Sequence, residues 1–409
     1  MSLSKVLKNN FFDNRKSYFT IIFIVSLISR VIVAYLYGDR SLENEWAILV
    51  NNLYNFNSFS LLNFGDLYLP NLWMPPVYGY FVYFHALIFG LNDNLASYVI
   101  ASQILISSIT SIIFYKIIEN FFSKNLSLVG TFIFSLFPLI VYSACQISSA
   151  SIYLFLLLLF IYCLFKLIEN NSNRNAIIIG ILAGILILTR RDFVLIYLFS
   201  IFYSIIFLKI NYKKLILIFL ISIVTISPYV IRNYMAFDKI IIHSGLGYNV
   251  WKAYNPEAKV EGYYEESKEL KRKIDNVKKD IFYRINEDKV YLKEAKIYIS
   301  DNPQKYIKLF FKRLFAFYFL DLNSSQPNYY NIFHIIPNLT LSLISLIGFV
   351  VCYKRNSKFN YLILTMFILL FVYSLFALLP RYKLYILPFQ IILSMSFFDY
   401  LLKKLSKNN

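Results

Sequence analysis

Two carboxylates stand close together just after the first apolar run, in the sequence Glu43-Asn44-Glu45-Trp46. A carboxylate at a membrane surface can remove a proton from a hydroxyl group or bind a divalent cation. Side chains two positions apart on a helix point about 200° apart, so we expect only one of Glu43 and Glu45 to face a site. An isolated acidic pair in a loop is more often a solvated surface. Its meaning therefore depends on the other charged groups of the chain.

Basic side chains at the ends of later apolar runs form the second set of candidate groups. They are Arg190, Arg191, Arg232, Arg381 and Lys383. A planar guanidinium presents paired N–H donors that match two oxygens of a phosphate. Any one of these residues could instead contact lipid phosphates or the carbonyls at a helix C-terminus. For the set as a whole we favour a ligand, and we expect these five residues to bind the phosphate of a substrate.

Aromatic and amide side chains in the same stretches form the third set. They are Trp46, Tyr78, Asn233, Tyr248 and Asn249. Aromatic faces can stack on sugar rings, and amides can donate and accept hydrogen bonds, so we expect these residues to bind substrate. A base, a clamp for a phosphate and an apolar groove for a lipid tail are the parts needed to transfer a sugar from a polyprenyl phosphate.

The elements that must position these groups are hydrophobic helices. Of the 409 residues, 58% are hydrophobic and only 16% are charged, whereas a soluble chain has about a quarter charged. Apolar runs of about 20 residues recur, the length that crosses roughly 30 Å of hydrocarbon. The chain is therefore expected to be an all-α polytopic membrane protein. Its net charge of +18 fits loops that face anionic headgroups, and the scattered basic residues exclude nucleic acid as a partner.

Cysteines and histidines give no pattern of a metal site or a disulfide framework. Cys145, Cys163 and Cys352 lie in or beside apolar segments, and His85, His243 and His334 are dispersed along the chain. These spacings match no zinc motif. We expect no permanent metal site and no certain cofactor, with a divalent cation as a candidate only.

The charges around the apolar runs predict which segments lie on each side of the membrane. Residues 1–17 are basic and should stay in the cytoplasm, so the uncleaved first span delivers Glu43 to the opposite side. The later basic clusters share the cytoplasmic side only if two short runs, 75–91 and 306–320, lie along the outer interface. About ten spans then remain, both termini lie inside, and the polar segment 236–305 lies outside.

Three parts follow from this topology. They are an N-terminal transmembrane module at 1–235 with a catalytic first outer loop at 38–94, a large outer loop with an interfacial helix at 236–322, and C-terminal transmembrane helices at 323–409. Within the large loop, 257–296 alternates charges in a way that is compatible with helices. No internal repeat is evident, which argues against inverted-repeat transporters, and we expect no soluble domain after the last span.

Six stretches of the chain carry a resemblance to a known family. They are 43–53, 75–78 with 89–90, 180–190, 228–248, 302–313 and 381–383. Their order and spacing resemble the GT-C glycosyltransferases of the dolichyl-phosphate-mannose protein mannosyltransferase type. This family-39-like group includes the bacterial aminoarabinose transferase that acts on lipid A. The resemblance runs over nearly the whole chain.

The resemblance implies a GT-C-like bundle of transmembrane helices with interfacial helices in the outer loops. It also implies a polyprenyl-phosphate sugar as donor, inversion at the anomeric centre, and an acidic residue of the first outer loop as catalytic base. The family pattern has Asp or Asp-Glu three to four residues before an aromatic residue, where this chain has Leu42-Glu43 before Trp46. We therefore expect Glu43 to be the base, with Glu45 as the second candidate. Relatives often have an acidic residue near the start of the fourth span, where this chain has only serines and alanine at 148–151.

The function that these features favour is a membrane glycosyltransferase. It would move a sugar from a polyprenyl-phosphate donor to an acceptor hydroxyl of a lipid, glycan or protein on the outer face of the cytoplasmic membrane, with membrane lipids as its other partners. One alternative is a flippase or transporter of an anionic lipid-linked substrate, which would work without Glu43 and Glu45. The other is an O-antigen polymerase or ligase, which would not need the acidic first loop.

Overall fold

The computed structural model describes residues 15–324, 331–351 and 356–408. Residues 1–14 of the basic N-terminal segment, and Cys352, lie outside the described residues.

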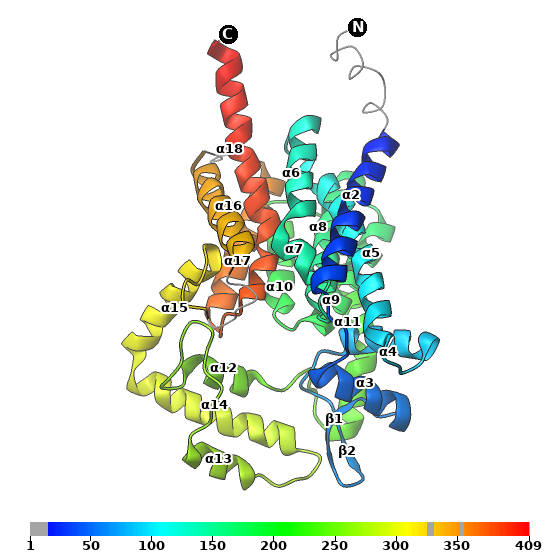
Figure 1. Ribbon diagram of the computed structural model, residues 1–409, viewed down its shortest axis with the longest axis vertical. Coiled ribbons are helices and arrows are strands. Elements are labelled where there is room, and N and C mark those ends of the chain that lie inside the picture. The colour runs from blue at the N-terminus through cyan, green and yellow to red at the C-terminus, as the bar shows by residue number, and fades with distance from the viewer. Residues whose placement is uncertain (1–14, 325–330, 352–355, 409) are drawn as a thin grey trace.

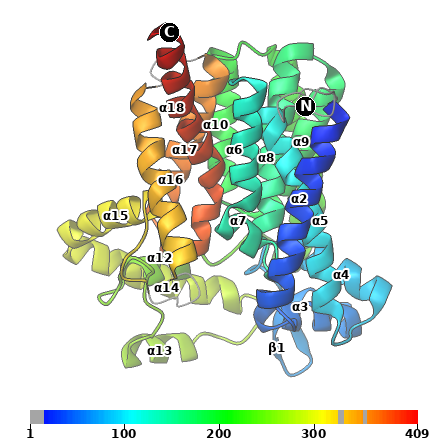
Figure 2. The same ribbon diagram turned by 45° about the horizontal axis from the view of Figure 1, so that its top comes forward.

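A bundle of apolar helices forms most of the described chain (Figures 1 and 2). Its helices are α2 (Arg15–Tyr37), α5 (Leu95–Ile118), α6 (Lys124–Leu136), α7 (Pro138–Ser143), α8 (Ala150–Asn170), α9 (Asn173–Thr189), α10 (Phe193–Ile206), α11 (Tyr212–Phe237), α16 (Ile332–Val351), α17 (Ser357–Ser374) and α18 (Leu387–Asn408). Within the described ranges, α2, α5, α8, α11, α16 and α17 are long and apolar enough to cross a membrane. The predicted all-α polytopic membrane fold is confirmed.

Nearly all other elements lie at one end of this bundle, which we call the loop end (Figure 1). They are α3 (Asn44–Phe56), the strands β1 (Ser60–Phe64) and β2 (Leu67–Pro70), α4 (Pro76–Phe89), α12 (Leu246–Tyr254), α13 (Lys268–Asp275), α14 (Tyr283–Asp301), α15 (Pro303–Tyr318) and the 3-10 helix η2 (Pro380–Tyr385). The first described turn of α2 and the end of α18 lie at the opposite end of the bundle (Figures 1 and 2).

The helices α4 and α15 are too short to span the hydrocarbon. They have 14 and 16 residues, or about 21 and 24 Å at 1.5 Å per residue, against a core of about 30 Å. In Figure 1, α4 projects sideways from the foot of α5, and α15 slants along the loop end. Both helices expose large apolar side chains, among them Phe84 on α4 and Phe311 on α15. These features fit the interfacial position expected for the runs 75–91 and 306–320.

The bundle is tightest where two glycines of α9 face α11. A Cβ atom added at Gly180 would lie 2.7 Å from Cβ of Ile221, and one added at Gly184 would lie 2.5 Å from Cβ of Thr225. The two glycines are four residues apart, so they lie on the same face of α9. This spacing of small residues lets the backbones of two membrane helices approach closely.

A buried arginine joins α2 to the neighbouring helices. Arg30 is fully buried, and its Nε donates to Oγ of Ser107 on α5 at 2.8 Å. Its Nη1 donates to the carbonyls of Ser26 and Ser135, each at 2.9 Å. These acceptors compensate for part of the cost of burying a charge among apolar helices. The sequence reading did not single this residue out.

The segment between α11 and α15 folds into a helical lobe, α12 to α14, which we call the outer lobe. Trp251, Leu270, Ile274 and Tyr291 form a small core of their own. A Cβ atom at Gly247 would lie 1.9 Å from the carbonyl oxygen of Asp288, so α12 and α14 meet backbone to backbone. The charge-alternating stretch is therefore a folded lobe at the loop end of the bundle.

Candidate active site

The loop between α2 and α5, which we call the first loop, is fastened to the end of α11. Arg232 Nη1 donates to the carbonyl of Asn71 at 3.1 Å and to Oδ1 of Asn233 at 2.7 Å, and its Nη2 donates to the carbonyl of Phe59 at 3.2 Å. The hydroxyl of Tyr229 donates to the same Asn71 carbonyl at 3.1 Å. Most donors of Arg232 are thus used inside the protein, where they hold the β1–β2 hairpin in place.

The first loop also contacts the outer lobe. Ser244 N donates to the carbonyl of Leu72 at 2.8 Å. The ring of Trp73 lies 5.0 Å from that of Tyr248, and the guanidinium of Arg284 lies 5.2 Å from the Trp73 ring. These contacts bring residues far apart in sequence to one region at the loop end.

The two glutamates of the first loop are exposed at either side of the first residue of α3. Glu43 stands directly before the helix and accepts a hydrogen bond from Oγ of Ser41 at 2.6 Å. Glu45 is in the first turn and lies within electrostatic range of Tyr248. The pKa of that phenol is raised mainly by burial, and to a lesser degree by carboxylates that include Glu45. Neither glutamate is in contact with the arginines of the bundle among the described contacts.

Asp39, which the sequence reading missed, is the most firmly held acid of the first loop. Its Oδ2 accepts a hydrogen bond from the backbone N–H of Ile147 at 2.7 Å, and its own N–H donates to the carbonyl of Cys145 at 3.1 Å. Burial, with a smaller contribution from the charge of Glu43, raises the pKa of this carboxyl above its ordinary value. Its signal in the sequence is its place just after the first apolar run, directly behind Gly38.

The expected substrate residues Trp46 and Tyr78 pack on each other beside this acid. Their rings lie 4.7 Å apart, edge to face. Tyr78 is fully buried, and its hydroxyl donates to Oε1 of Gln103 at 2.7 Å. Gln103 in turn donates to the carbonyl of Gln146 at 2.8 Å. Tyr78 therefore connects the start of α4 to the segment that holds Asp39, and in this conformation it has no surface left for a substrate.

Arg190 belongs to the short segment between α9 and α10, and its guanidinium lies within a cluster of aromatic rings. Its guanidinium carbon lies 4.9–5.6 Å from the ring centres of Tyr153, Tyr373, Tyr382 and Tyr385. Its Nη1 donates to the hydroxyl of Tyr385 at 3.0 Å, and its Nε pairs with Asp192 at 3.1 Å. Asp192 also accepts a hydrogen bond from Tyr373. We call these residues the arginine–tyrosine cluster.

Arg191 belongs to the same segment between α9 and α10, and its side chain points toward the outer lobe. Its Nη1 donates to Nδ1 of His243 at 2.9 Å, with the carbonyls of Ser244 and Gly245 at 3.5 Å. Burial and the charge of Arg191 lower the pKa of His243 to about 3, so the imidazole is neutral and accepts this bond. Unlike Arg190, Arg191 makes no ion pair with any carboxylate among residues 15–324, 331–351 and 356–408.

The acid and the arginines are connected by one short segment. Ile147 holds Asp39, and Tyr153, six residues further along the chain in the first turn of α8, contacts Arg190. The hydroxyl of Tyr153 is buried without a hydrogen-bond partner in the described structure. The start of α8 therefore joins the first-loop acid to the arginine–tyrosine cluster.

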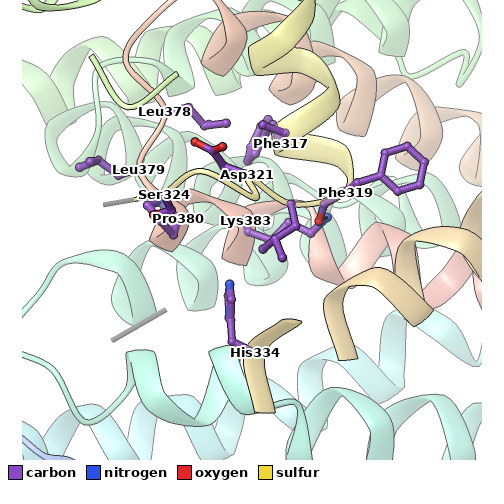
Figure 3. A pocket seen from close by; sticks show the side chains of 11 residues that line it. Phe317, Phe319, Asp321, Ser324, His334, Leu378, Leu379, Pro380 and Lys383 are labelled. Atoms are coloured by element: carbon purple, nitrogen blue, oxygen red, sulfur yellow. Dashed lines mark hydrogen bonds between the residues drawn. The ribbon is translucent and has the colours of Figure 1, made fainter. Parts of the chain in front are cut away.

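Two other expected site residues are buried and bonded inside the protein. The ammonium of Lys383 donates to the carbonyls of Tyr318 and Phe319 and to Oγ of Ser342. Lys383 also lines a small cavity between α15, α16 and η2, together with Asp321 and His334 (Figure 3). All three donors of this ammonium are used, and they join the end of α15 to the middle of α16.

Asn233 is also fully buried. Its amide nitrogen donates to the carbonyl of Ile241 at 2.7 Å, and its amide oxygen accepts from Arg232. Asn249 donates to the carbonyl of Gly245 at 2.6 Å. By contrast, Arg381 is exposed on η2, and the described contact of its guanidinium is with the ring of Tyr382 at 5.9 Å. The polar groups of Asn233, Asn249 and Lys383 are thus used in bonds within the protein, whereas Arg381 is a cation that a ligand can reach.

Across the described ranges, no three His, Cys, Asp or Glu side chains gather to hold a metal ion.

The comparison with protein families supports the resemblance found in the sequence. The family model of dolichyl-phosphate-mannose-protein mannosyltransferases matches residues 74–231. This stretch begins after Asp39, Glu43 and Glu45, and it includes Arg190 and Arg191 but not the outer lobe. The resemblance to this type of GT-C glycosyltransferase is confirmed for that part of the chain. No curated protein matches the chain by sequence.

The fold is similar to that of a solved archaeal oligosaccharyltransferase. The archaeal oligosaccharyltransferase AglB from Archaeoglobus fulgidus, in complex with an inhibitory peptide and a dolichol-phosphate, aligns with a TM-score of 0.55 at 14% identity, covering 96% of this chain and 51% of AglB. ArnT from Cupriavidus metallidurans, bound to undecaprenyl phosphate, aligns with a TM-score of 0.42 at 10% identity, covering 94% of this chain and 77% of ArnT. The chain thus spans about half the length of AglB, and at this identity the likeness to AglB concerns the fold.

Proposed function

We propose that this multi-pass membrane protein is an inverting glycosyltransferase that moves a sugar from a polyprenyl-phosphate donor to an acceptor hydroxyl. The observation that carries the proposal is the connection of the first-loop acid Asp39 to the arginine–tyrosine cluster through the start of α8. The family model and the fold support it, and AglB, which has that fold, is a transferase in complex with a dolichol-phosphate. The loop end would face the extracytoplasmic side of the cytoplasmic membrane.

A carboxylate of the first loop acts as the base in this proposal. It removes the proton of the acceptor hydroxyl while the oxygen attacks the anomeric carbon from the side opposite the phosphate, which inverts that centre. Asp39 suits the role because one of its oxygens is fixed by Ile147 and its raised pKa brings it closer to that of an efficient base. Glu43 and Glu45, the bases expected from the sequence, are exposed and remain the alternatives to be tested beside it.

The arginines stabilise the departing phosphate. Bond cleavage turns a phosphodiester with one negative charge into a phosphate monoester with up to two, so donors that are already in place favour the transition state over the ground state. Asp192 balances the charge of Arg190, whereas the charge of Arg191 is balanced by no ion pair in the described structure. Arg191 is therefore the residue that contacts the phosphate. The arginine–tyrosine cluster positions the segment between α9 and α10 that carries Arg191.

The test is transfer by the purified full-length protein in proteoliposomes. A panel of polyprenyl-phosphate sugars, radiolabelled in the phosphate, is supplied with a membrane extract as acceptor, and the release of free polyprenyl phosphate is followed. We expect release with at least one sugar and a product of inverted anomeric configuration by NMR. Movement of intact sugar–lipid across the bilayer without bond cleavage would instead identify a flippase.

A further inference from the structure

Lys252, in the last turn of α12, is a buried cation that pairs with no anionic group among the described residues. Only 9% of its surface is exposed, and its ammonium lies 4.0 Å from the ring centre of Tyr264. Within the described part of the chain its ammonium makes no ion pair, and its described contact is with this ring. An aromatic face compensates only in part for the lost hydration of an ammonium. Such a group needs a further partner.

A second cation lies next to Lys252. Arg381 of η2 is close enough for its charge to act on Lys252, and it packs against Tyr382 as Lys252 packs against Tyr264. Arg381 likewise makes no ion pair with any carboxylate that the structure describes. Two adjacent like charges repel each other, so the arrangement is unfavourable unless an anion lies between them.

The backbone of a short loop holds these two cations together. The N–H of Tyr263 donates to the carbonyl of Lys252 at 3.0 Å, and the N–H of Leu378 donates to the carbonyl of Val260 at 3.0 Å. Between them, Gly262 has φ +83° and fits in a space where a Cβ would lie 2.7 Å from Cβ of Ala377. The loop 260–264 thus fixes α12 against the link that leads into η2.

Among the described residues, Glu261 is the carboxylate that acts on Lys252, and it is engaged elsewhere. Glu261 has an electrostatic effect on Lys252, yet it lies beyond ion-pair distance and accepts a hydrogen bond from Ser324. Tyr264 and Tyr382 complete the surroundings as rings. The pair therefore keeps its capacity to bind an anion.

The pair adjoins the arginine–tyrosine cluster, which positions Arg191, the residue proposed to contact the leaving phosphate. The ring of Tyr382 that Arg381 contacts at 5.9 Å is also 5.1 Å from the guanidinium of Arg190. One tyrosine thus separates the two groups of cations.

We propose that Lys252 and Arg381 form a second oxyanion subsite, lined by Tyr264 and Tyr382, for a second phosphate or a carboxylate of the substrate. This inference rests on the proposed function, because that function supplies the first anion at Arg191. The two sources of the second oxyanion are a diphosphate linkage in the donor and an acidic sugar, and they are distinguished by the probes below.

The first experiment measures binding to the full-length protein in detergent by calorimetry. Farnesyl phosphate and farnesyl diphosphate are each titrated alone. Glucuronate and glucose are then compared as ligands in the presence of saturating farnesyl phosphate. In Lys252→Met, which keeps the length and suits the burial of the side chain, we expect about a ten- to hundredfold loss for the probe with the second oxyanion. Farnesyl phosphate alone should bind as to the unmodified protein. Lys271→Met, at an exposed lysine of α13, is the matched control.

The pattern of affinity losses identifies the source of the second oxyanion. A loss confined to farnesyl diphosphate assigns the subsite to a second phosphate, and a loss confined to glucuronate assigns it to an acidic sugar. Unchanged affinity for both probes in Lys252→Met, with an unchanged melting temperature, would overturn the proposal. An equal loss for farnesyl phosphate would also overturn it, since Lys252 would then belong to the first phosphate site.

A pH titration gives an independent readout. Burial, and then the charge of Arg381, lower the pKa of Lys252 to about 8, while Glu261 acts in the opposite direction. The ammonium is charged below that value, so the preference for the second oxyanion should fall as the pH rises through about 8. Lys252→Arg keeps its charge throughout this range, and its preference should stay constant. A pH-independent preference in the unmodified protein would contradict the proposal.

Failure here is separable from failure of the proposed function. Binding of these probes requires no turnover, so a protein that transfers no sugar can still prefer the second oxyanion. Conversely, a protein that transfers sugar but binds farnesyl diphosphate and glucuronate equally well with and without Lys252→Met would keep the function and lose the subsite.

Discussion

Replacing Asp39 with asparagine removes the proposed base while preserving its fixed hydrogen bond. The amide oxygen of the new side chain would still accept from the N–H of Ile147, which the carboxylate accepts at 2.7 Å in the present structure. A positioned general base contributes about 10²–10⁴-fold to a rate, so the variant should lose about 2.7–5.4 kcal/mol of transition-state stabilisation. Donor affinity should change little, because Asp39 makes no described contact with the arginines.

Stability should not fall with the activity. The pKa of Asp39 is raised by burial and by Glu43, so the ionised form is less favourable in the folded protein than in the unfolded chain. Above the unfolded pKa this group therefore lowers the free energy of unfolding, and its removal at neutral pH should leave the melting temperature equal or higher. The rate of the unmodified protein should fall as the pH drops through this raised pKa, because the carboxylate is then protonated.

The assay is single-turnover release of polyprenyl phosphate at saturating donor, for Asp39→Asn beside Glu43→Gln and Glu45→Gln. The account predicts that Asp39→Asn alone loses about two to four orders of magnitude. Full activity in Asp39→Asn, together with loss of activity in Glu43→Gln, would refute the assignment and return the base to the residue expected from the sequence. Full activity in all three variants would refute acid–base chemistry by the first loop.

Three other variants test the remaining parts of the account. Arg191→Gln should weaken binding of farnesyl phosphate by about 1.5–3 kcal/mol, as measured by calorimetry, and unchanged affinity would exclude a phosphate contact. Arg232→Ala should release the β1–β2 hairpin from Phe59 and Asn71, so proteolysis in the first loop should speed up and the melting temperature should fall; an unchanged cleavage rate would show that the fastening is dispensable. Gly184→Leu should separate α9 from α11 and lower the melting temperature or the yield of folded protein, and a normal melting temperature would contradict the close packing.

The general architecture could be predicted from composition and periodicity. Long apolar runs predict spans because the hydrocarbon demands internal hydrogen bonding of the backbone. The runs at 75–91 and 306–320 were separable from spans because their length and charge conflict with a crossing. Both are short helices at the loop end. These properties are local, so the sequence alone contains them.

The roles of individual site residues could not be predicted in the same way. Arg191, Arg232 and Lys383 look alike in sequence, since each is a basic residue at the end of an apolar run. In the folded protein, Arg232 and Lys383 donate hydrogen bonds to backbone carbonyls and side chains distant in sequence. Arg191 makes no ion pair among the described residues. Asp39 was missed for the same reason, because its partner Ile147 lies 108 residues away.

The most direct measurement is a structure of the full-length protein with bound polyprenyl phosphate, the leaving group common to every sugar donor. The account predicts its phosphate within about 3 Å of the guanidinium of Arg191, beside the arginine–tyrosine cluster, with Asp39 on the open side of the site. A phosphate bound away from Arg190 and Arg191, or at the opposite end of the bundle, would contradict it.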